Sequence, residues 1–559
     1  MTASWEELAA NKKRAQAESI PKEWLINTPP DSQLNVSKVP LECGLLSERE
    51  VEITELKDVD VLLQRLAASD YSAVEVTTAF YKRAIVAHQL TNCLTEIFID
   101  RALAWARELD ESLKKNGKPK GPLHGLPISL KDQLCIEGLD TTMGYISWIG
   151  KPASKNAVLV DILLEAGAVP FVRTNVPQTL MWPETFNLIF GRTTNPYNRS
   201  LTSGGSSGGE GALIALGGSI LGVGSDVGGS VRIPAAFNGL YGLRPSYNRI
   251  PYQDAVNSME GQESIYSVFG PLSPRMSGIK AFTKAVIDSE PWRRDPVAIR
   301  KAWDEKAYQL EEHGNGQNLV FGILWDDDWV VPHPPVKRAL QRTKDALLKA
   351  GHKTVDWKAL KHGDIYAVGG AIWAADGGKD FDTTCAPTGE PLISTMLPSS
   401  TEDTPEPPAF RQRAKKTAYE LWQIHKQKRA LRKEYLDSWE ATKSVTGTGR
   451  PIDAIISPVA PWAPPPHGKN TSAAYTLIWN TLDYAACVFP VTTVNPAIDV
   501  VAPPHDFKNK DDQATYELYD PEVFKGAPVG LQVVGRPQEE EAVIALTEIV
   551  AAALKGLPE

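Results

Sequence analysis

The sequence predicts an α/β fold in which a large, mixed β-sheet is flanked by helices on both faces. Short apolar runs that resemble strands alternate with apolar residues at helical spacing, as in residues 156–168 followed by residues 169–174. Residues 1 to about 120 carry mostly helical patterns, so we expect a helical N-terminal section that packs on the sheet. Strand-like runs return after residue 451 and predict further strands of the same core.

Changes of pattern divide the chain into four stretches. These are a helical section (1–120), a core of alternating strands and helices (121–285), a variable region of α/β and helical character (286–450), and a C-terminal part that completes the sheet and ends in a helix (451–559). In the first stretch we expect helices over residues 4–18, 58–89 and 100–115.

The last two stretches are assigned element by element. Residues 319–325 and 353–357 predict strands, and residues 334–352 between them predict a helix that Gly351 ends. Residues 399–408 are acidic and proline-rich and predict an exposed loop. The basic run 425–429 lies in the following helix and is typical of a solvated helix face. Residues 452–462 and 527–535 predict strands, and residues 540–555 predict a helix that ends at Gly556.

Two glycine-rich segments, residues 202–211 and 222–230, each contain a serine that stands out, Ser206 and Ser230. Glycine lets backbone N–H groups approach a developing anion closely, so this pattern indicates a hydrolytic site. The first segment also matches the G-x-S-x-G elbow, but no downstream histidine has a neighbourhood typical of a catalytic base. No Gly-Lys-Ser/Thr closes either segment, so a phosphate-binding loop is excluded. A glycine-rich packing turn is the alternative that stays open.

A short apolar run that begins near Pro127 predicts a strand that ends in a lysine. Alternation places Ile128 and Leu130 on one face and Ser129 and Lys131 on the other. A lysine at the end of a buried strand is unusual, and a lone lysine more often extends to solvent. The two serine-bearing turns favour a functional role for Lys131.

Three motifs together resemble the amidase signature family, and within it the fungal acetamidases. They are GLPIS followed by KDQ, GGSSGGEG, and GSDVGGSVRIPAAFNGLYGLRPS, and the resemblance extends over nearly the whole chain as one unit. It implies that Ser230 is the nucleophile, Ser206 a bridging serine and Lys131 the base, with a cis peptide bond before Ser206. It also implies hydrolysis of small aliphatic or aromatic primary amides to carboxylate and ammonia through an acyl-enzyme on Ser230.

The chemistry of this triad requires an uncharged lysine. A serine hydroxyl is a poor nucleophile at neutral pH, so a base must accept its proton during attack. Lysine can accept a proton only as the free amine, which burial favours. We therefore expect Lys131 to be buried and unprotonated, with Ser206 passing a proton between it and Ser230.

The turn before the nucleophile is expected to bind the oxyanion. The backbone N–H groups expected to converge on the substrate carbonyl oxygen are those of Val227, Gly228, Gly229 and Ser230. By resemblance, Ser225, Asp226 and Arg232 support the shape of this turn, although an ordinary ion pair or helix cap is an equal interpretation of Asp226 and Arg232.

The substrate pocket is the part that the sequence defines least. The resemblance places Met143, Leu180, Met181 and Trp182 in its walls, next to Ser206, together with residues near positions 461–462 or 475–480, although each could be core. Trp182 is larger than the residue expected in the acetamidase pattern, which keeps larger aliphatic or aromatic amides open. Further alternatives are an amidase acting on lipid amides, a glutamine-hydrolysing amidotransferase-type subunit and a non-catalytic binding scaffold.

Composition narrows the partners and the compartment. The net charge of −9 argues against nucleic acid or an anionic membrane as a partner. Five scattered cysteines favour a reducing compartment, and we expect a cytoplasmic enzyme. None of the usual metal-ligand spacings is present, so we expect neither a metal nor a cofactor. The expected partner is a small amide substrate, and the resemblance leaves a homodimer open.

Overall fold

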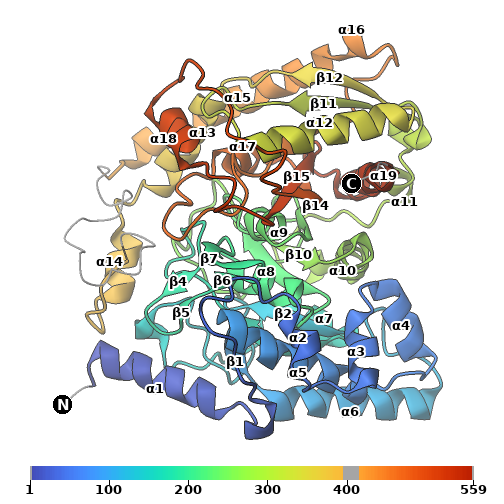
Figure 1. Ribbon diagram of the computed structural model, residues 1–559, viewed down its shortest axis with the longest axis vertical. Coiled ribbons are helices and arrows are strands. Elements are labelled where there is room, and N and C mark those ends of the chain that lie inside the picture. The colour runs from blue at the N-terminus through green and yellow to red at the C-terminus, as the bar shows by residue number, and fades with distance from the viewer. Residues whose placement is uncertain (1–2, 394–414, 557–559) are drawn as a thin grey trace.

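The computed structural model describes residues 3–393 and 415–556, and its centre is a mixed sheet of eleven strands. The strand order is β1-β3-β2-β8-β10-β9-β14-β15-β13-β11-β12, which runs from the bottom to the top of the view in Figure 1. The strands in this order are β1 (Leu94–Ile97), β3 (Val169–Thr174), β2 (Pro127–Lys131), β8 (Gly222–Asp226), β10 (Val268–Ser273), β9 (Tyr241–Arg244), β14 (Ala486–Thr493), β15 (Pro528–Val534), β13 (Ala454–Pro458), β11 (Val320–Leu324) and β12 (Lys353–Trp357). The predicted α/β class with a mixed sheet is confirmed.

The sheet has a parallel segment on each side of an antiparallel middle. Strand β2 pairs in parallel with β3 and β8, and β11 pairs in parallel with β12 and β13. The remaining pairs are antiparallel. Two small ribbons lie outside this sheet, β4 (Phe186–Asn187) with β5 (Gly191–Arg192) and β6 (Thr194–Asn195) with β7 (Asn198–Thr202).

The N-terminal section is helical, as predicted. Its helices are α1 (Trp5–Glu18), α2 (Val39–Glu42), α3 (Glu48–Glu55), α4 (Val59–Ala67), α5 (Ala73–Thr91) and α6 (Ile99–Asn116). The one helix expected over residues 58–89 is in fact two, α4 and α5. Ser69 has a positive φ of 61°, and the Ser72 hydroxyl then caps α5 by accepting a hydrogen bond from Glu75 N–H at 3.0 Å.

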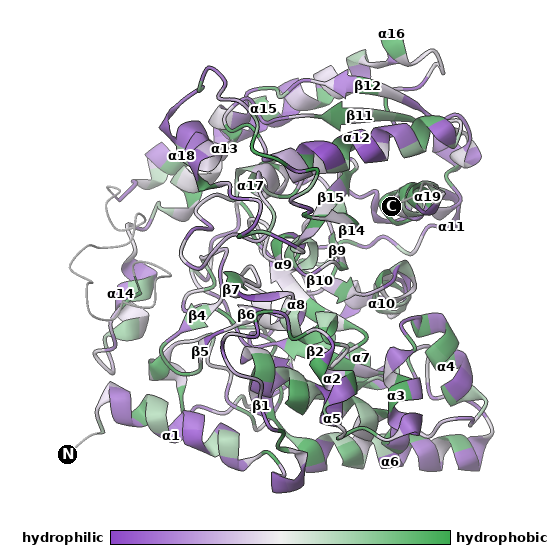
Figure 2. Ribbon diagram, viewed as in Figure 1, coloured by the Kyte–Doolittle hydropathy of each residue, from purple (hydrophilic) through white to green (hydrophobic). Residues whose placement is uncertain are grey.

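Helices cover both faces of the sheet, as strand β11 illustrates. Phe321 and Ile323 pack in one apolar cluster with residues of α12 and α19, whereas Val320 and Leu324 pack in another with residues of α13, α15 and α17. Figure 2 shows hydrophilic and hydrophobic residues alternating along α12, as expected of a helix with one face on the core. The helices after the N-terminal section are α7 (Val158–Glu165), α8 (Gly208–Ala215), α9 (Arg232–Phe237), α10 (Met276–Asp288), α11 (Glu305–Tyr308), α12 (Pro334–Lys349), α13 (His362–Trp373), α14 (Lys379–Cys385), α15 (Ala418–Ala441), α16 (Lys443–Thr446), α17 (Ala474–Leu482), α18 (Lys510–Leu518) and α19 (Glu540–Lys555).

The prediction that the basic run 425–429, now seen in α15, lies on a solvated helix face is only partly correct. His425 and Lys428 are half-buried, and both contact Ser264, through its hydroxyl and its carbonyl respectively. Lys426, Gln427 and Arg429 are exposed. The loop expected over residues 399–408 lies outside the described residues. In the part of the chain that the structure describes, no helix combines the length and the apolar character that crossing a bilayer requires.

Candidate active site

Lys131 lies at the carboxyl end of strand β2, which pairs with β3 and β8. Its side chain has no exposed surface, as the sequence predicted. Lys131 Nζ lies 2.7 Å from Ser206 Oγ and 2.7 Å from Ser225 Oγ. The strand therefore delivers one amine to two hydroxyls from separate segments, and the contact with Ser225 was not expected.

The environment of Lys131 favours the free amine. Burial lowers the pKa of the Lys131 ammonium to about 7, although the charge of Asp226, and that of Glu210 when it is ionised, act in the opposite direction. A large share of the side chain is therefore uncharged at neutral pH, when it can accept a proton.

Ser206 lies in a turn that leads into helix α8. The peptide bond between Gly205 and Ser206 is cis, as the resemblance implied. A side chain at position 205 would meet the backbone of Glu184 at 2.5 Å and that of Trp182 at 2.7 Å, so the turn packs directly on this segment. Ser206 is 1% exposed.

Ser230 lies in the turn between β8 and α9 and is 7% exposed, more than Lys131 or Ser206. Ser207 N–H donates to the carbonyl oxygen of Ser230 at 3.2 Å and so joins the two serine turns through the backbone. The structure thus places Ser230 beside the turn of Ser206. A direct contact between the two hydroxyls stays a prediction.

Asp226 and Arg232 brace the turn that carries Ser230. Both are fully buried, and Arg232 Nε and Nη2 each lie 3.0 Å from an oxygen of Asp226. Asn480 Nδ2 also donates to Asp226, at 2.8 Å. Burial alone would raise the pKa of Asp226, but the charge and hydrogen bonds of Arg232 and the amide of Asn480 hold it well below its usual range. The carboxylate is therefore ionised and structural.

One of the four backbone N–H groups expected to bind the oxyanion, that of Gly229, has a different partner in the structure. Gly229 N–H donates to Asp226 Oδ1 at 2.8 Å, so this donor holds the turn together and is not directed at a substrate. Gly229 also has a φ of +134°, and a Cβ there would collide with Thr476. Val227 and Gly228 are half-exposed and lie on the accessible side of the turn.

The residues expected in the pocket walls fall into two groups. Met143 and Leu180 are buried in an apolar cluster with Tyr145 and Phe381. Met181 is half-buried and contacts that cluster as well as the one that includes Trp373. Trp182 is half-buried, and its carbonyl group packs against the Ser206 turn.

One buried residue of this region, Glu210, was missed by the sequence reasoning. Glu210 is fully buried, and burial raises its pKa to about 7. The Thr476 hydroxyl donates to Gly228 O at 2.6 Å, and Arg232 Nη2 donates to Asn480 Oδ1 at 2.5 Å. The acidic residue inside the motif GGSSGGEG was a signal for Glu210. Thr476 and Asn480 belong to the stretch 475–480 that the resemblance places near the pocket, about 250 positions from the turn, but their contacts with the turn were not expected.

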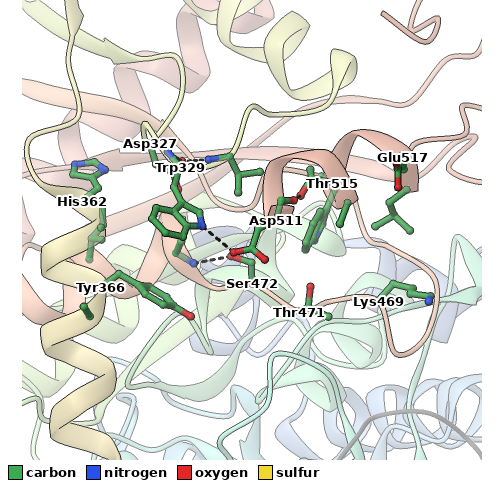
Figure 3. A pocket seen from close by; sticks show the side chains of 18 residues that line it. Asp327, Trp329, His362, Tyr366, Lys469, Thr471, Ser472, Asp511, Thr515 and Glu517 are labelled. Carbon is green, nitrogen blue, oxygen red and sulfur yellow. Dashed lines mark hydrogen bonds between the residues drawn. The ribbon is translucent and has the colours of Figure 1, made fainter. Parts of the chain in front are cut away.

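A cavity of about 650 Å³ lies beside helix α17, on the side away from Thr476 and the Ser230 turn. Figure 3 shows the side chains that line it. Helices α13, α17 and α18 and two loops form its walls. Its side chains include Trp329, Tyr366, Trp462 and Ile478. The carboxylic acid and lysine side chains of the lining are Asp327, Asp511, Glu517 and Lys469. Ala474 and Ile478 face this cavity, while Thr476 between them contacts the turn of Ser230. One helix therefore separates the cavity from the candidate nucleophile.

Comparison with known proteins assigns the family. A model of the amidase family matches residues 75–544. The chain is 44% identical to an acetamidase of Emericella nidulans and 42% identical to an acetamidase of Aspergillus oryzae, in each case over 98% of both chains. A solved structure of a fatty acid amide hydrolase superimposes with a TM-score of 0.89 at 33% identity, covering 98% of this chain and 95% of that chain. The chain therefore belongs to the amidase family, and it is a hydrolase that acts on amide bonds.

Proposed function

We propose that this amidase cleaves its substrate with Ser230 as nucleophile, Ser206 as proton relay and Lys131 as base. The observation that carries the proposal is the fully buried amine of Lys131 at 2.7 Å from Ser206 Oγ, and burial lowers the pKa of this amine to about 7. An uncharged amine in hydrogen-bond contact with a hydroxyl can accept that hydroxyl's proton. Ser230, on the neighbouring turn, is the most exposed of the three residues and is the one that meets the substrate.

The acylation half-reaction follows from this arrangement. Ser230 Oγ attacks the amide carbon while its proton passes to Ser206 Oγ, and the proton of Ser206 passes to Lys131 Nζ. The carbonyl oxygen becomes an oxyanion, for which the N–H groups of Val227, Gly228 and Ser230 are the proposed donors. As the C–N bond breaks, the proton returns through Ser206 to the departing nitrogen, and ammonia leaves.

Deacylation uses the same groups in reverse. Water attacks the acyl-enzyme ester at Ser230 while its proton passes through Ser206 to Lys131. The tetrahedral intermediate collapses, the Ser230 oxygen recovers a proton through the relay, and the carboxylic acid is released. No net change of protonation remains on the three residues.

Small primary amides are the proposed substrates. Two acetamidases are 44% and 42% identical to this chain over almost their whole length, which supports a short acyl group. Met143, Leu180, Met181 and Trp182 are proposed to close the acyl side of the pocket around Ser206. Turnover of acetamide, propionamide, benzamide and glutamine by the purified chain would rank these substrates, and hydrolysis of acetamide without a partner subunit would exclude the amidotransferase alternative.

Larger or lipid amides are the second candidate. The cavity of about 650 Å³ has the size of sites that hold drug-sized ligands, but α17 lies between it and the Ser230 turn, so a long acyl chain occupies it only if it passes this helix. The similarity to a fatty acid amide hydrolase points in the same direction. A fatty amide therefore belongs in the same turnover panel, and a kcat/KM above that of acetamide would select this candidate.

Covalent labelling tests the proposed nucleophile. A fluorophosphonate is expected to modify the wild-type protein on the peptide that contains Ser230, as read by mass spectrometry, and Ser230→Ala is expected to lose both labelling and hydrolysis. Ser273→Ala is the matched control, because Ser273 is also buried but donates to Ile220 O, away from the candidate site. Labelling of Ser230→Ala at the wild-type level would refute the assignment.

We also propose a cytoplasmic location, and the resemblance leaves a homodimer open as the assembly. The thiols of Cys43, Cys93, Cys135 and Cys487 are free, which supports a reducing compartment. Light scattering on the purified chain measures the assembly directly.

A further inference from the structure

A second buried polar network lies behind the Lys131 amine, on the same strand. Ser129, two residues before Lys131 on β2, contacts Glu210 Oε2 at 2.5 Å and Ser219 Oγ at 2.9 Å. Ser219 Oγ contacts Leu221 O at 2.9 Å, and Thr174 Oγ1 contacts Glu210 Oε1 at 2.9 Å. The four side chains are 0% to 1% exposed. Glu210 lies so close over β8 that a Cβ at Gly222 would collide with its carboxyl group.

The number of protons available for these hydrogen bonds indicates whether the carboxyl group of Glu210 is protonated or ionised. Leu221 O can only accept, so its contact uses the hydroxyl proton of Ser219, and the contact between Ser219 and Ser129 then uses the proton of Ser129. Thr174 supplies the proton for Glu210 Oε1. The remaining contact, between Ser129 and Glu210 Oε2, also needs a proton, but the hydroxyl protons of Ser129, Ser219 and Thr174 are already used. Only a protonated carboxyl group satisfies all four contacts, because an ionised one would leave two oxygen lone pairs facing each other.

The contacts of Lys131 agree with this count. A free amine has two N–H groups and one lone pair, so it can donate to Ser225 and accept from Ser206. An ammonium group would have a third N–H, for which the hydrogen bonds among the described residues provide no acceptor. Lys131 and Glu210 interact electrostatically, so an ionised Glu210 would favour the ammonium form.

We propose that Glu210 is a positioning residue that keeps Lys131 basic. Glu210 is a neutral carboxylic acid that donates a hydrogen bond to Ser129. Of the two residues, Glu210 therefore carries the proton and Lys131 is the free amine. The inference rests on the proposed role of Lys131 as base. A carboxyl group in this position fixes the end of β2 through Ser129 and adds no negative charge behind the amine. The other charged or titratable groups near the pair are Asp226, which Arg232 neutralises, and the Cys93 thiol, whose pKa burial raises to about 12.

Infrared difference spectroscopy tests the state of Glu210 directly. The spectrum of wild type minus Glu210→Gln is expected to contain the carbonyl stretch of a protonated carboxylic acid at pH 7, because other buried carboxyl groups cancel in the difference. A difference spectrum that contains only carboxylate bands would overturn the inference. This readout does not involve Lys131, so its failure is distinct from failure of the proposed mechanism, which the Lys131 variants test.

The acidic limb of the pH profile of kcat/KM tests the effect on Lys131. Ser219→Ala frees the Ser129 hydroxyl proton for Glu210, which can then ionise, so the limb is expected to move to higher pH. The double variant Ser219→Ala/Glu210→Gln is expected to return the limb to the wild-type position, because glutamine donates to Ser129, accepts from Thr174 and carries no charge. Glu210→Gln alone is expected to leave the limb in place, and a shift to lower pH would show that the wild-type residue is an ionised counter-charge. No shift in Ser219→Ala would also overturn the inference, since a purely structural network predicts that result.

Discussion

Lys131 Nζ and Ser225 Oγ lie 2.7 Å apart, the same distance that separates Lys131 Nζ from Ser206 Oγ. Ser225 belongs to strand β8, which pairs in parallel with β2, so two adjacent strands fix the position of the amine. If Ser206 is the relay, Ser225 is the group that orients the lone pair of the amine toward it.

Ser225→Ala is therefore expected to lower kcat by about 5-fold with little change in KM, because one buried hydrogen bond of about 1 kcal/mol is lost from the base. Ser206→Ala is expected to lower kcat by about 10²- to 10⁴-fold, because the proton path itself is interrupted. Steady-state kinetics on both variants measures the difference. Equal losses in the two variants would contradict the division of roles.

The pH dependence of hydrolysis should report the Lys131 amine. Burial lowers the pKa of Lys131 to about 7, so the amine is protonated below that pH and can no longer accept a proton. We expect kcat/KM to rise with pH through an acidic limb near pH 7 and then to level off. Lys131→Ala is expected to lose most of the activity together with this limb. A limb that persists in the residual activity of Lys131→Ala would assign the titration to another group.

Asp226→Asn tests the brace beneath the Ser230 turn. The variant keeps the shape of the side chain but leaves the guanidinium group of Arg232 buried without a counter-charge, which typically costs about 3 kcal/mol or more of unfolding free energy. Asp70→Asn is the matched control, because Asp70 pairs with Arg65 at the same distance of 3.0 Å, but both side chains are about half exposed. The control should cost less than about 1 kcal/mol. Urea unfolding of both variants compares them, and equal losses would contradict a structural role of the buried pair.

The sequence predicted the parts of the site that are local in the chain. Lys131 at the end of a short apolar run and the serines in their glycine turns could be read from spacing alone, and the structure places them together. Ser129, Thr174 and Glu210 come from separate elements, so their contacts depend on strand order, which no local pattern encodes. The same reason explains His425 and Lys428, whose partner Ser264 lies over 160 positions away. The break between α4 and α5, in contrast, had a local signal in Ser72 followed by Glu75.

Substitution at the mouth of the cavity separates the two substrate candidates. Ala367 is an exposed residue of α13 that lines the cavity, and a tryptophan there would fill part of its volume. If large amides occupy the cavity, Ala367→Trp should lower kcat/KM for a fatty amide by about 10-fold or more, since losing a few buried methylene groups is worth more than 1.4 kcal/mol. The kcat/KM for acetamide should change little, because a short acyl group would stay on the Ser230 side of α17. Asp364→Trp, an exposed position of the same helix outside the cavity lining, controls for the bulk of the new side chain. Equal effects of Ala367→Trp on both substrates would show that the cavity does not discriminate between them.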